Sequence, residues 1–174
     1  MNLQPTINGE LIRIAPSSEE DREVLFAVAS DRLIWEQHPA HDRWQRPVFD
    51  ALFNAGIESG GALTVRDVAT NEVIGSSRYY AWTPAEQHVS IGCTYLARRC
   101  WGGTYNHELK RLMLQHAFNF VERVWFHIEV KNHRSRRAIA TVGGKLSHEV
   151  PSDPSFSGWA TAYYYIDRSS WLRR

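Results

Sequence analysis

Apolar and polar residues recur along the chain with two periods, which separate the predicted strands from the predicted helices. Alternating or continuously apolar runs bounded by Gly, Pro, Asn or Ser predict strands. Apolar residues spaced three and four apart predict amphipathic helices. The predicted strands are residues 10–16, 62–68, 73–82, 88–97, 123–130, 145–150 and 160–171, and the predicted helices are residues 18–30, 47–59, 105–121 and 132–143.

Local signals place several boundaries between these elements. Ser18 precedes an acidic first turn, which indicates a capped helix start. Gly143 follows the last predicted helix and is typical of a C-cap. The polar stretch around Asn71 predicts a hairpin turn. The order of strand, two helices, three strands, helix, strand, helix and two strands predicts one α+β domain over residues 1–174, with a mostly antiparallel seven-stranded sheet flanked by about four helices.

Composition and charge narrow the possible function classes. The formal net charge is +1, so the overall charge of the chain does not favour nucleic acid or an anionic membrane as a partner. The first residues show no charged segment followed by an apolar one, and no apolar run approaches the roughly 20 residues of a membrane span. Cys93 and Cys100 suggest no disulfide framework. We therefore expect a cytoplasmic protein with neither nucleic acid nor a membrane as a partner.

Residues 98–105, RRCWGGTY, place two arginines and two glycines directly before a predicted helix. A helix N-terminus exposes unpaired backbone N–H groups and the positive end of the helix dipole, and glycine lets the main chain approach an anion closely. The segment is therefore interpreted either as a phosphate cradle or as a strand-to-helix turn that needs glycine for its geometry. It matches neither the Walker loop nor the G-x-G-x-x-G pattern.

Two motifs together resemble those of the GNAT acyltransferase superfamily. The family's pyrophosphate-binding motif is Arg or Gln, two residues, Gly, one residue, and Gly or Ala; Arg99 and Gly102 match it, whereas Thr104 departs from it at the sixth position. WGGTYNHELKRLML, with its early Glu108, resembles the branch that contains the ribosomal-protein-alanine N-acetyltransferases. VKNHRSRRAIATVGG resembles the later family motif, in which a Ser follows an Asn by three residues and Gly ends the helix. The resemblance covers roughly residues 10 to 168.

The resemblance implies acetyl-CoA as the co-substrate and no metal. In the family, the fourth strand, here residues 88–97, splays from the fifth, here residues 123–130, and the pantetheine arm lies between them. The loop before the helix would bind pyrophosphate, and the fourth strand would contact the pantetheine and polarise the acetyl carbonyl. The residues expected to bind acetyl-CoA are Cys93, Thr94, Tyr95, Leu96, Arg98, Arg99, Trp101, Gly102, Gly103, Thr104, Tyr105, Asn132, Arg134, Ser135 and Arg137.

Acetyl transfer to an amine needs a proton acceptor at the amine and a proton donor at the thiolate. The family's usual Glu on the fourth strand is replaced by Ser90, and His88 lies two residues earlier on the same face of the predicted strand. The family's usual Tyr is absent, since Ile139 takes its place, and Ser135 matches the serine of the branch resembled. His88, Ser90 and Ser135 are therefore the expected catalytic residues. A surface histidine and an ordinary helix serine remain the alternatives for His88 and Ser135.

The aromatic segment between the first two helices is expected to cover the acceptor side, as such segments do in this family. Trp35, His38, His41 and Trp44 are predicted to wall an acceptor pocket, although the two tryptophans could equally anchor the core. Arg78 and Tyr80 share one face of the third predicted strand, and Arg78 would suit a substrate carboxylate.

The leading interpretation is thus an N-acetyltransferase that moves an acetyl group from acetyl-CoA to a primary amine by direct attack in a ternary complex. Because the usual Glu and Tyr are both absent, a non-catalytic acyl-CoA-binding or scaffold protein of the same fold remains the alternative. A third interpretation places the Trp and His residues at an interaction surface, such as that of a homodimer. The acceptor is expected to be either a protein N-terminus or a small-molecule amine.

Overall fold

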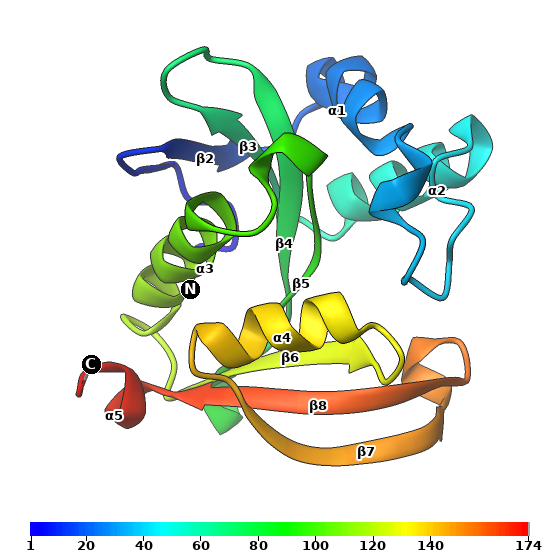
Figure 1. Cartoon of the computed structure of the whole chain (residues 1–174). Coiled ribbons are helices and arrows are strands. Elements are labelled where there is room, and N and C mark those ends of the chain that lie inside the picture. Colours follow the sequence, from blue (N-terminus) through cyan, green and yellow to red (C-terminus); the bar gives the residue numbers. More distant parts are fainter. Residues whose placement is uncertain (174) are drawn as a thin grey trace.

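A computed structural model describes residues 1–173 of the chain. One eight-stranded sheet with the strand order β1-β2-β3-β4-β5-β6-β8-β7 forms its centre (Figure 1). All neighbouring strands are antiparallel except β5 and β6, which run parallel. The strands are β1 (Ile7–Asn8), β2 (Ile12–Pro16), β3 (Ala62–Asp67), β4 (Val73–Thr83), β5 (His88–Leu96), β6 (Arg123–Glu129), β7 (Lys145–Asp153) and β8 (Trp159–Asp167).

The helices pack into two separate hydrophobic clusters. Leu109 and Met113, on the third helix, join the large cluster, which contains side chains from all the longer strands except β7. Phe49 and Phe53, on the second helix, pack with Trp35 in the smaller cluster, which meets the sheet at Tyr95. The helices are α1 (Arg22–Ala29), α2 (Arg46–Glu58), α3 (Thr104–Ala117), α4 (His133–Thr141) and α5 (Arg168–Trp171).

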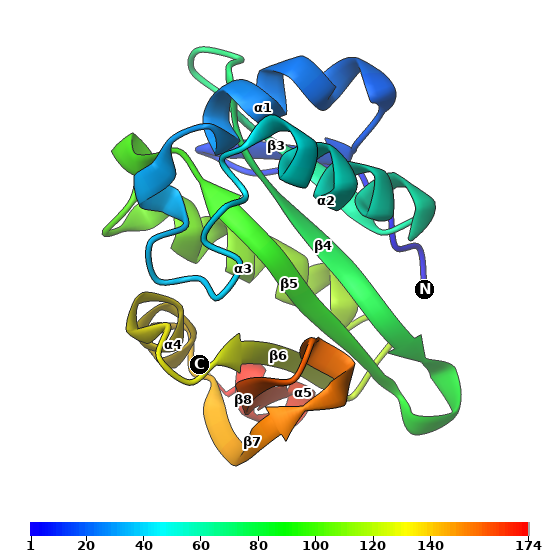
Figure 2. The same ribbon diagram turned by 90° about the vertical axis from the view of Figure 1, so that its right-hand side faces the viewer.

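The sheet opens between β5 and β6. The two strands pair only where His88–Ser90 faces Arg123–Trp125, although β5 continues to Leu96 and β6 to Glu129. Beyond this pairing the strands diverge, with α4 beside the opening (Figure 2). The register of β4 against β5 also shifts here, and Cys93 has a φ of +50°. Such a bulge bends a strand and redirects its side chains. The predicted splay between these two strands is therefore confirmed.

The structure differs from the predicted fold at both ends of the chain and at one helix end. β1 was not predicted, and residues 168–171, which were predicted to end the last strand, form α5 instead; residues 1–173 therefore contain eight strands rather than seven, and five helices. A two-residue strand and a single helical turn are too short to show a period in the sequence. The helix predicted to end at residue 121 ends at Ala117, and Phe120 is 50% exposed.

The predicted end of the fourth helix is confirmed. Gly143 has a φ of +93°, and the N–H of Gly144 donates to the carbonyl oxygen of Ile139 at 2.9 Å. This is the left-handed helix termination that glycine favours. Among residues 1–173, no helix combines the length and apolar character needed to cross a bilayer.

Candidate active site

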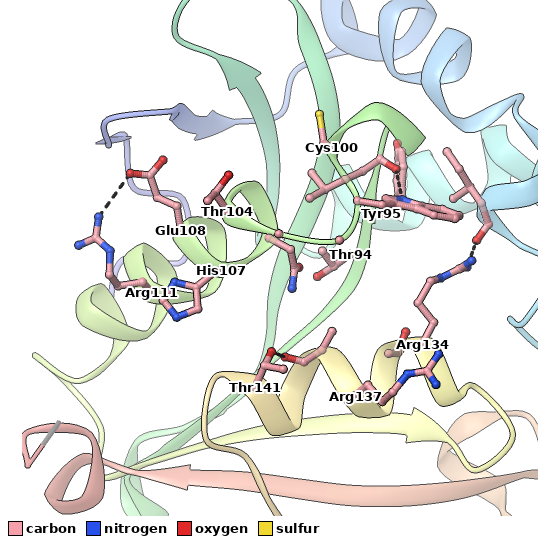
Figure 3. Close-up of a pocket in the computed structure, with 18 of the residues that line it drawn as sticks. Thr94, Tyr95, Cys100, Thr104, His107, Glu108, Arg111, Arg134, Arg137 and Thr141 are labelled. Atoms are coloured by element: carbon pink, nitrogen blue, oxygen red, sulfur yellow. Dashed lines mark hydrogen bonds and ion pairs between the residues drawn. The ribbon is translucent and has the colours of Figure 1, made fainter.

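A cleft of about 900 Å³ lies between the end of β5, the start of α3 and α4 (Figure 3). Figure 3 shows Thr94 and Tyr95 on β5, Thr104 at the start of α3, and Arg134 and Arg137 on α4 across the gap. We call this cavity the donor cleft. Its lining includes eleven of the residues expected to bind acetyl-CoA: Thr94, Tyr95, Leu96, Trp101, Gly102, Gly103, Thr104, Asn132, Arg134, Ser135 and Arg137.

The loop at one end of the donor cleft has the geometry of an anion cradle. α3 begins at Thr104, and no side chain caps its first N–H groups. A Cβ atom built on Gly102 or Gly103 would meet nothing within 4 Å, so the backbone borders open space. Gly102 also has a backbone φ of +77°, which residues other than glycine rarely adopt. Free N–H groups at a helix start beside open space fit the diphosphate of CoA.

α4 supplies cationic and hydroxyl groups on the opposite side of the donor cleft. The side-chain oxygen of Asn132 accepts the backbone N–H of Ser135 at 3.1 Å and thereby caps the helix. The guanidinium of Arg134 lies 4.1 Å from the ring centre of Trp101 and 3.3 Å from Glu36. Burial lowers the pKa of Arg134, but an arginine stays charged near neutrality. The indole N–H of Trp101 donates to the carbonyl oxygen of Leu96 at 3.0 Å, which fixes this wall.

Three of the residues expected to bind acetyl-CoA point elsewhere. Arg98 forms an ion pair with Asp31, and Arg99 lies 2.6 Å from Glu72. The hydroxyl of Tyr105 donates to Asp67 at 2.6 Å. None of Arg98, Arg99 and Tyr105 lines the donor cleft. Cys93 lines the neighbouring cavity instead.

This second cavity, of about 390 Å³, adjoins the donor cleft and is lined by residues of β4, β5 and β6, and we call it the acceptor cavity. The two spaces share a boundary, and the residues that line both are Trp35, His38, Thr94, Asn106, Asn132, Ser135 and Ala138. His38 and Trp159 stand edge to face across it with their ring centres 5.9 Å apart. The segment after α1 therefore reaches the C-terminal strands. The other aromatic walls are Trp35, Tyr80, Phe126 and Phe156.

The two histidines in the acceptor cavity are held neutral. Burial, together with the positive charge of Arg43, lowers the pKa of His38 to about 3. Burial also lowers the pKa of His127 to about 4. The hydroxyl of Tyr80 lies 2.7 Å from Nδ1 of His127, and burial raises the pKa of this tyrosine. These groups can donate and accept hydrogen bonds at neutral pH without adding charge.

The predicted acceptor residues divide into two groups. Arg78 and Tyr80 line the acceptor cavity, and so does Trp35. Trp35 is also a core residue, because its indole N–H donates to the carbonyl oxygen of Ala29 at 2.7 Å and its ring is buried. His41 is exposed, and Trp44 lies under the guanidinium of Arg32. Neither His41 nor Trp44 lines the acceptor cavity.

His88 and Ser90 lie at the closed end of the splay, in a third depression of about 610 Å³. Nδ1 of His88 is 3.5 Å from the carboxylate of Glu86, and Ser90 is buried. His127 lines both this depression and the acceptor cavity, so it stands between His88 and the place where the two main cavities meet.

The comparisons with known proteins agree with this geometry. Residues 12–145 match the family described as acetyltransferase (GNAT) domain. The chain belongs to the GNAT family. A GCN5-related N-acetyltransferase from Brucella melitensis has the same fold, with a TM-score of 0.82 and 22% identity over 97% of this chain and 81% of that one. A comparison with curated protein sequences gives no match.

Two further GNAT structures of the same fold were solved with ligands. Spermidine N-acetyltransferase from Vibrio cholerae, in complex with CoA and spermine, has a TM-score of 0.69 and 15% identity over 94% of this chain and 99% of that one. The microcin C7 self-immunity acetyltransferase, in complex with acetyl-CoA and AMP, has a TM-score of 0.77 and 12% identity over 95% and 98%. None of these likenesses singles out the ribosomal-protein-alanine branch, and at such identities they show the fold alone.

Sequence reasoning missed three polar residues of this GNAT site, Arg43, Lys110 and His127, whereas His38 lines the acceptor cavity as predicted. For Lys110 a signal was present. It precedes Met113 and Leu114 by three and four residues, so it lies on the buried stripe of α3 where an apolar residue is expected. For Arg43 and His127 the sequence carries no comparable signal. Within residues 1–173, no three His, Cys, Asp or Glu side chains are placed to hold a metal ion.

Proposed function

We propose that this chain is an N-acetyltransferase that moves the acetyl group of acetyl-CoA to a primary amine in a ternary complex. The observation that carries the proposal is that the two cavities share a boundary, which includes Thr94 on β5 and Asn132 and Ser135 at the start of α4, beside the opening between β5 and β6. A donor bound in one cavity and an amine bound in the other would meet there without either leaving its site. Such positioning is worth several orders of magnitude in rate.

The fit of the donor cleft to acetyl-CoA rests on its two ends. The free N–H groups before α3, next to Gly102 and Gly103, suit the diphosphate. Arg137 lies across the cleft on α4 and adds positive charge. At the other end the cleft meets the acceptor cavity, where Thr94 of β5 and Ser135 of α4 line both spaces. Acetyl-CoA supplies the activated thioester.

In the proposed reaction a bond forms between the amine nitrogen and the acetyl carbonyl carbon, and the bond from that carbon to sulfur breaks. One proton leaves the nitrogen and one is needed at the sulfur. Ser135 is the proposed donor to the thiolate, because its side chain borders both cavities. A main-chain N–H of β5 is the proposed donor to the carbonyl oxygen, and one such donor is worth about 3–4 kcal/mol.

His88 is the proposed acceptor of the amine proton, directly or through a water held by Ser90. Its depression adjoins the acceptor cavity at His127, which offers a hydrogen-bonding group between them. A neutral imidazole can take a proton near neutral pH, and a positioned base contributes roughly 100- to 10,000-fold in rate. The small size of the acceptor cavity suits either a small amine or the first residue of a polypeptide.

A panel of amines incubated with acetyl-CoA and the purified chain tests this proposal through the release of free CoA. We expect release that depends on both the amine and the protein. Binding of acetyl-CoA without any amine-dependent release would instead favour the acyl-CoA-binding alternative. If acetyl-CoA does not bind at all, both the acetyltransferase and the acyl-CoA-binding interpretations are wrong.

A further inference from the structure

Resting on the proposed function, we infer that the acceptor is an amine that also carries an anionic group, such as a carboxylate, and that Arg43, Arg78 and Lys110 form the subsite for this group. All three residues line the acceptor cavity, and none of them forms an ion pair with an acidic side chain among residues 1–173. The substrate would supply the missing negative charge.

Arg43 is the clearest of the three. Its guanidinium lies 3.0 Å from Nε2 of His38 and 5.6 Å from the ring centre of Trp35, and both partners are uncharged. Burial lowers the pKa of Arg43, and the positive charge of Arg78 lowers it as well, so the two guanidinium groups repel each other. The adjacent Asp42 acts in the opposite direction but forms no ion pair with Arg43.

Arg78 extends this cluster toward α2. Its two terminal nitrogens donate to carbonyl oxygens of α2, one to Leu52 at 3.2 Å and the other to Ala55 at 3.4 Å, which holds the side chain in place. Its Nε is buried and has no hydrogen-bond partner among the described residues. Lys110 approaches the cavity from α3, and its Nζ donates to Thr94 at 2.7 Å. Thus the cluster draws on three separate elements: the segment before α2, strand β4 and helix α3.

Acidic groups do not balance this charge within the cavity. Glu129 is the one carboxylate among the lining residues of the described chain, and it accepts the backbone N–H of Lys131 at 2.8 Å. Buried charges are normally paired, because an unpaired charge loses its hydration without recovering a partner. An arginine fork binds carboxylate or phosphoryl oxygens in two-point geometry, which makes such a group the natural counter-ion.

The rest of the acceptor cavity restricts the chemical class of the acceptor amine further. Its walls are aromatic, and its volume of about 390 Å³ is that of a small-molecule site. An amine that carries a carboxylate on an apolar body, as a free amino acid does, fits these features. A polyamine does not, since its additional ammonium groups would face Arg43 and Arg78.

Matched pairs of acceptors that differ only in the carboxylate test this inference: phenylalanine against 2-phenylethylamine, leucine against 3-methylbutylamine, and ornithine against putrescine. With the full chain and acetyl-CoA, we expect the carboxylated member to have the higher kcat/KM, by about 10- to 100-fold, the range expected for one charged hydrogen-bonded contact. The aminophosphonate analogue of phenylalanine separates a phosphoryl preference from a carboxylate preference.

The matched variants are Arg43→Gln and Arg13→Gln. Arg13 is exposed on β2 and donates to Asn71, far in the fold from the cavity, so its substitution should leave the preference unchanged. Arg43→Gln should reduce the preference for the carboxylated member by about tenfold or more. Thermal unfolding of both variants would establish that each is folded.

A binding measurement separates this inference from the proposed function. Calorimetry of the CoA-loaded chain with N-acetylphenylalanine and with N-(2-phenylethyl)acetamide reports acceptor-site preference without turnover. If no amine of any kind releases CoA, the proposed function fails, and the calorimetric preference still decides the anion subsite. If uncharged or polycationic amines react and bind as well as their carboxylated partners, the anion subsite is wrong while the proposed function stands.

Discussion

The Nζ of Lys110 lies 2.7 Å from Oγ1 of Thr94, and Thr94 lines both the donor cleft and the acceptor cavity. The lysine side chain is buried, and burial lowers its pKa to about 7. An aromatic ring, that of Phe126, lies 5.8 Å from the ammonium, whereas no carboxylate within residues 1–173 pairs with it. A group that titrates near neutrality thus sits where the two substrates are proposed to meet.

Stability should depend on pH through Lys110. Its pKa falls from 10.5 to about 7 on folding, so between these values the unfolded chain binds one more proton than the folded chain. The free energy of unfolding therefore gains up to about 1.4 kcal/mol per pH unit from this residue as pH rises through that window, and loses it as pH falls toward 7. Denaturant unfolding at several pH values should show a smaller slope in Lys110→Met. The exposed Lys131→Met serves as the control, and equal slopes in both variants would contradict the account.

Donor binding should depend on Gly102. Gly102→Ala forces a side chain into a φ of +77° at the proposed diphosphate cradle, so we expect the Kd for acetyl-CoA in calorimetry to rise by about tenfold or more. Gly60→Ala is the matched control, because Gly60 has a φ of +63° and equally open surroundings but lies at the end of α2. Both variants should lose about 1 kcal/mol of stability. Equal Kd values in the two variants would show that the loop does not hold the donor.

Ser135→Ala should lower kcat by about 100-fold or more while the Kd for acetyl-CoA stays nearly constant. The helix cap survives this change, because Asn132 accepts the backbone N–H of residue 135 rather than its hydroxyl. Loss of activity therefore reports the hydroxyl itself. A kcat within about twofold of the wild type, far below the usual contribution of a general acid, would remove Ser135 from the mechanism.

The acidic limb of kcat/KM should depend on His88. A protonated imidazole cannot accept the amine proton, so activity falls as pH falls. The pKa of His127 is about 4 and that of His38 about 3, so neither produces a limb near neutrality. His88→Ala should abolish the limb and slow the reaction. His133→Ala, at an exposed residue, should change neither the limb nor the rate. If the limb persists in His88→Ala but disappears in Lys110→Met, the buried lysine is the base instead.

The order of the major elements was predictable because each long element repeats its apolar pattern several times. The splay was predicted from the family resemblance rather than from periodicity, and its local cause, the bulge at Cys93, left no sequence signal. The short β1 was missed and the residues of α5 were wrongly assigned to the last strand, because two to four residues cannot show a period.

The parts of the candidate site that lie in one local segment were predictable from the sequence. The parts assembled from distant segments were much less so. The proposed roles of the glycines before α3 and of Asn132 depend on local backbone geometry, and these residues line the cavities as predicted. Arg99 matched a motif position, yet Glu72 on the neighbouring hairpin engages its side chain. Arg43 and His127 come from distant segments, and only the tertiary structure brings them to one cavity.

The most direct measurement of the central claim is product analysis by mass spectrometry after incubation of the full chain with acetyl-CoA and an amine. The account predicts an N-acetylated amine in an amount equal to the free CoA formed, with neither product accumulating without the protein. Free CoA without acetylated amine would indicate thioester hydrolysis. Tight binding of acetyl-CoA with no product from any amine would contradict catalysis and leave a binding protein with the GNAT fold.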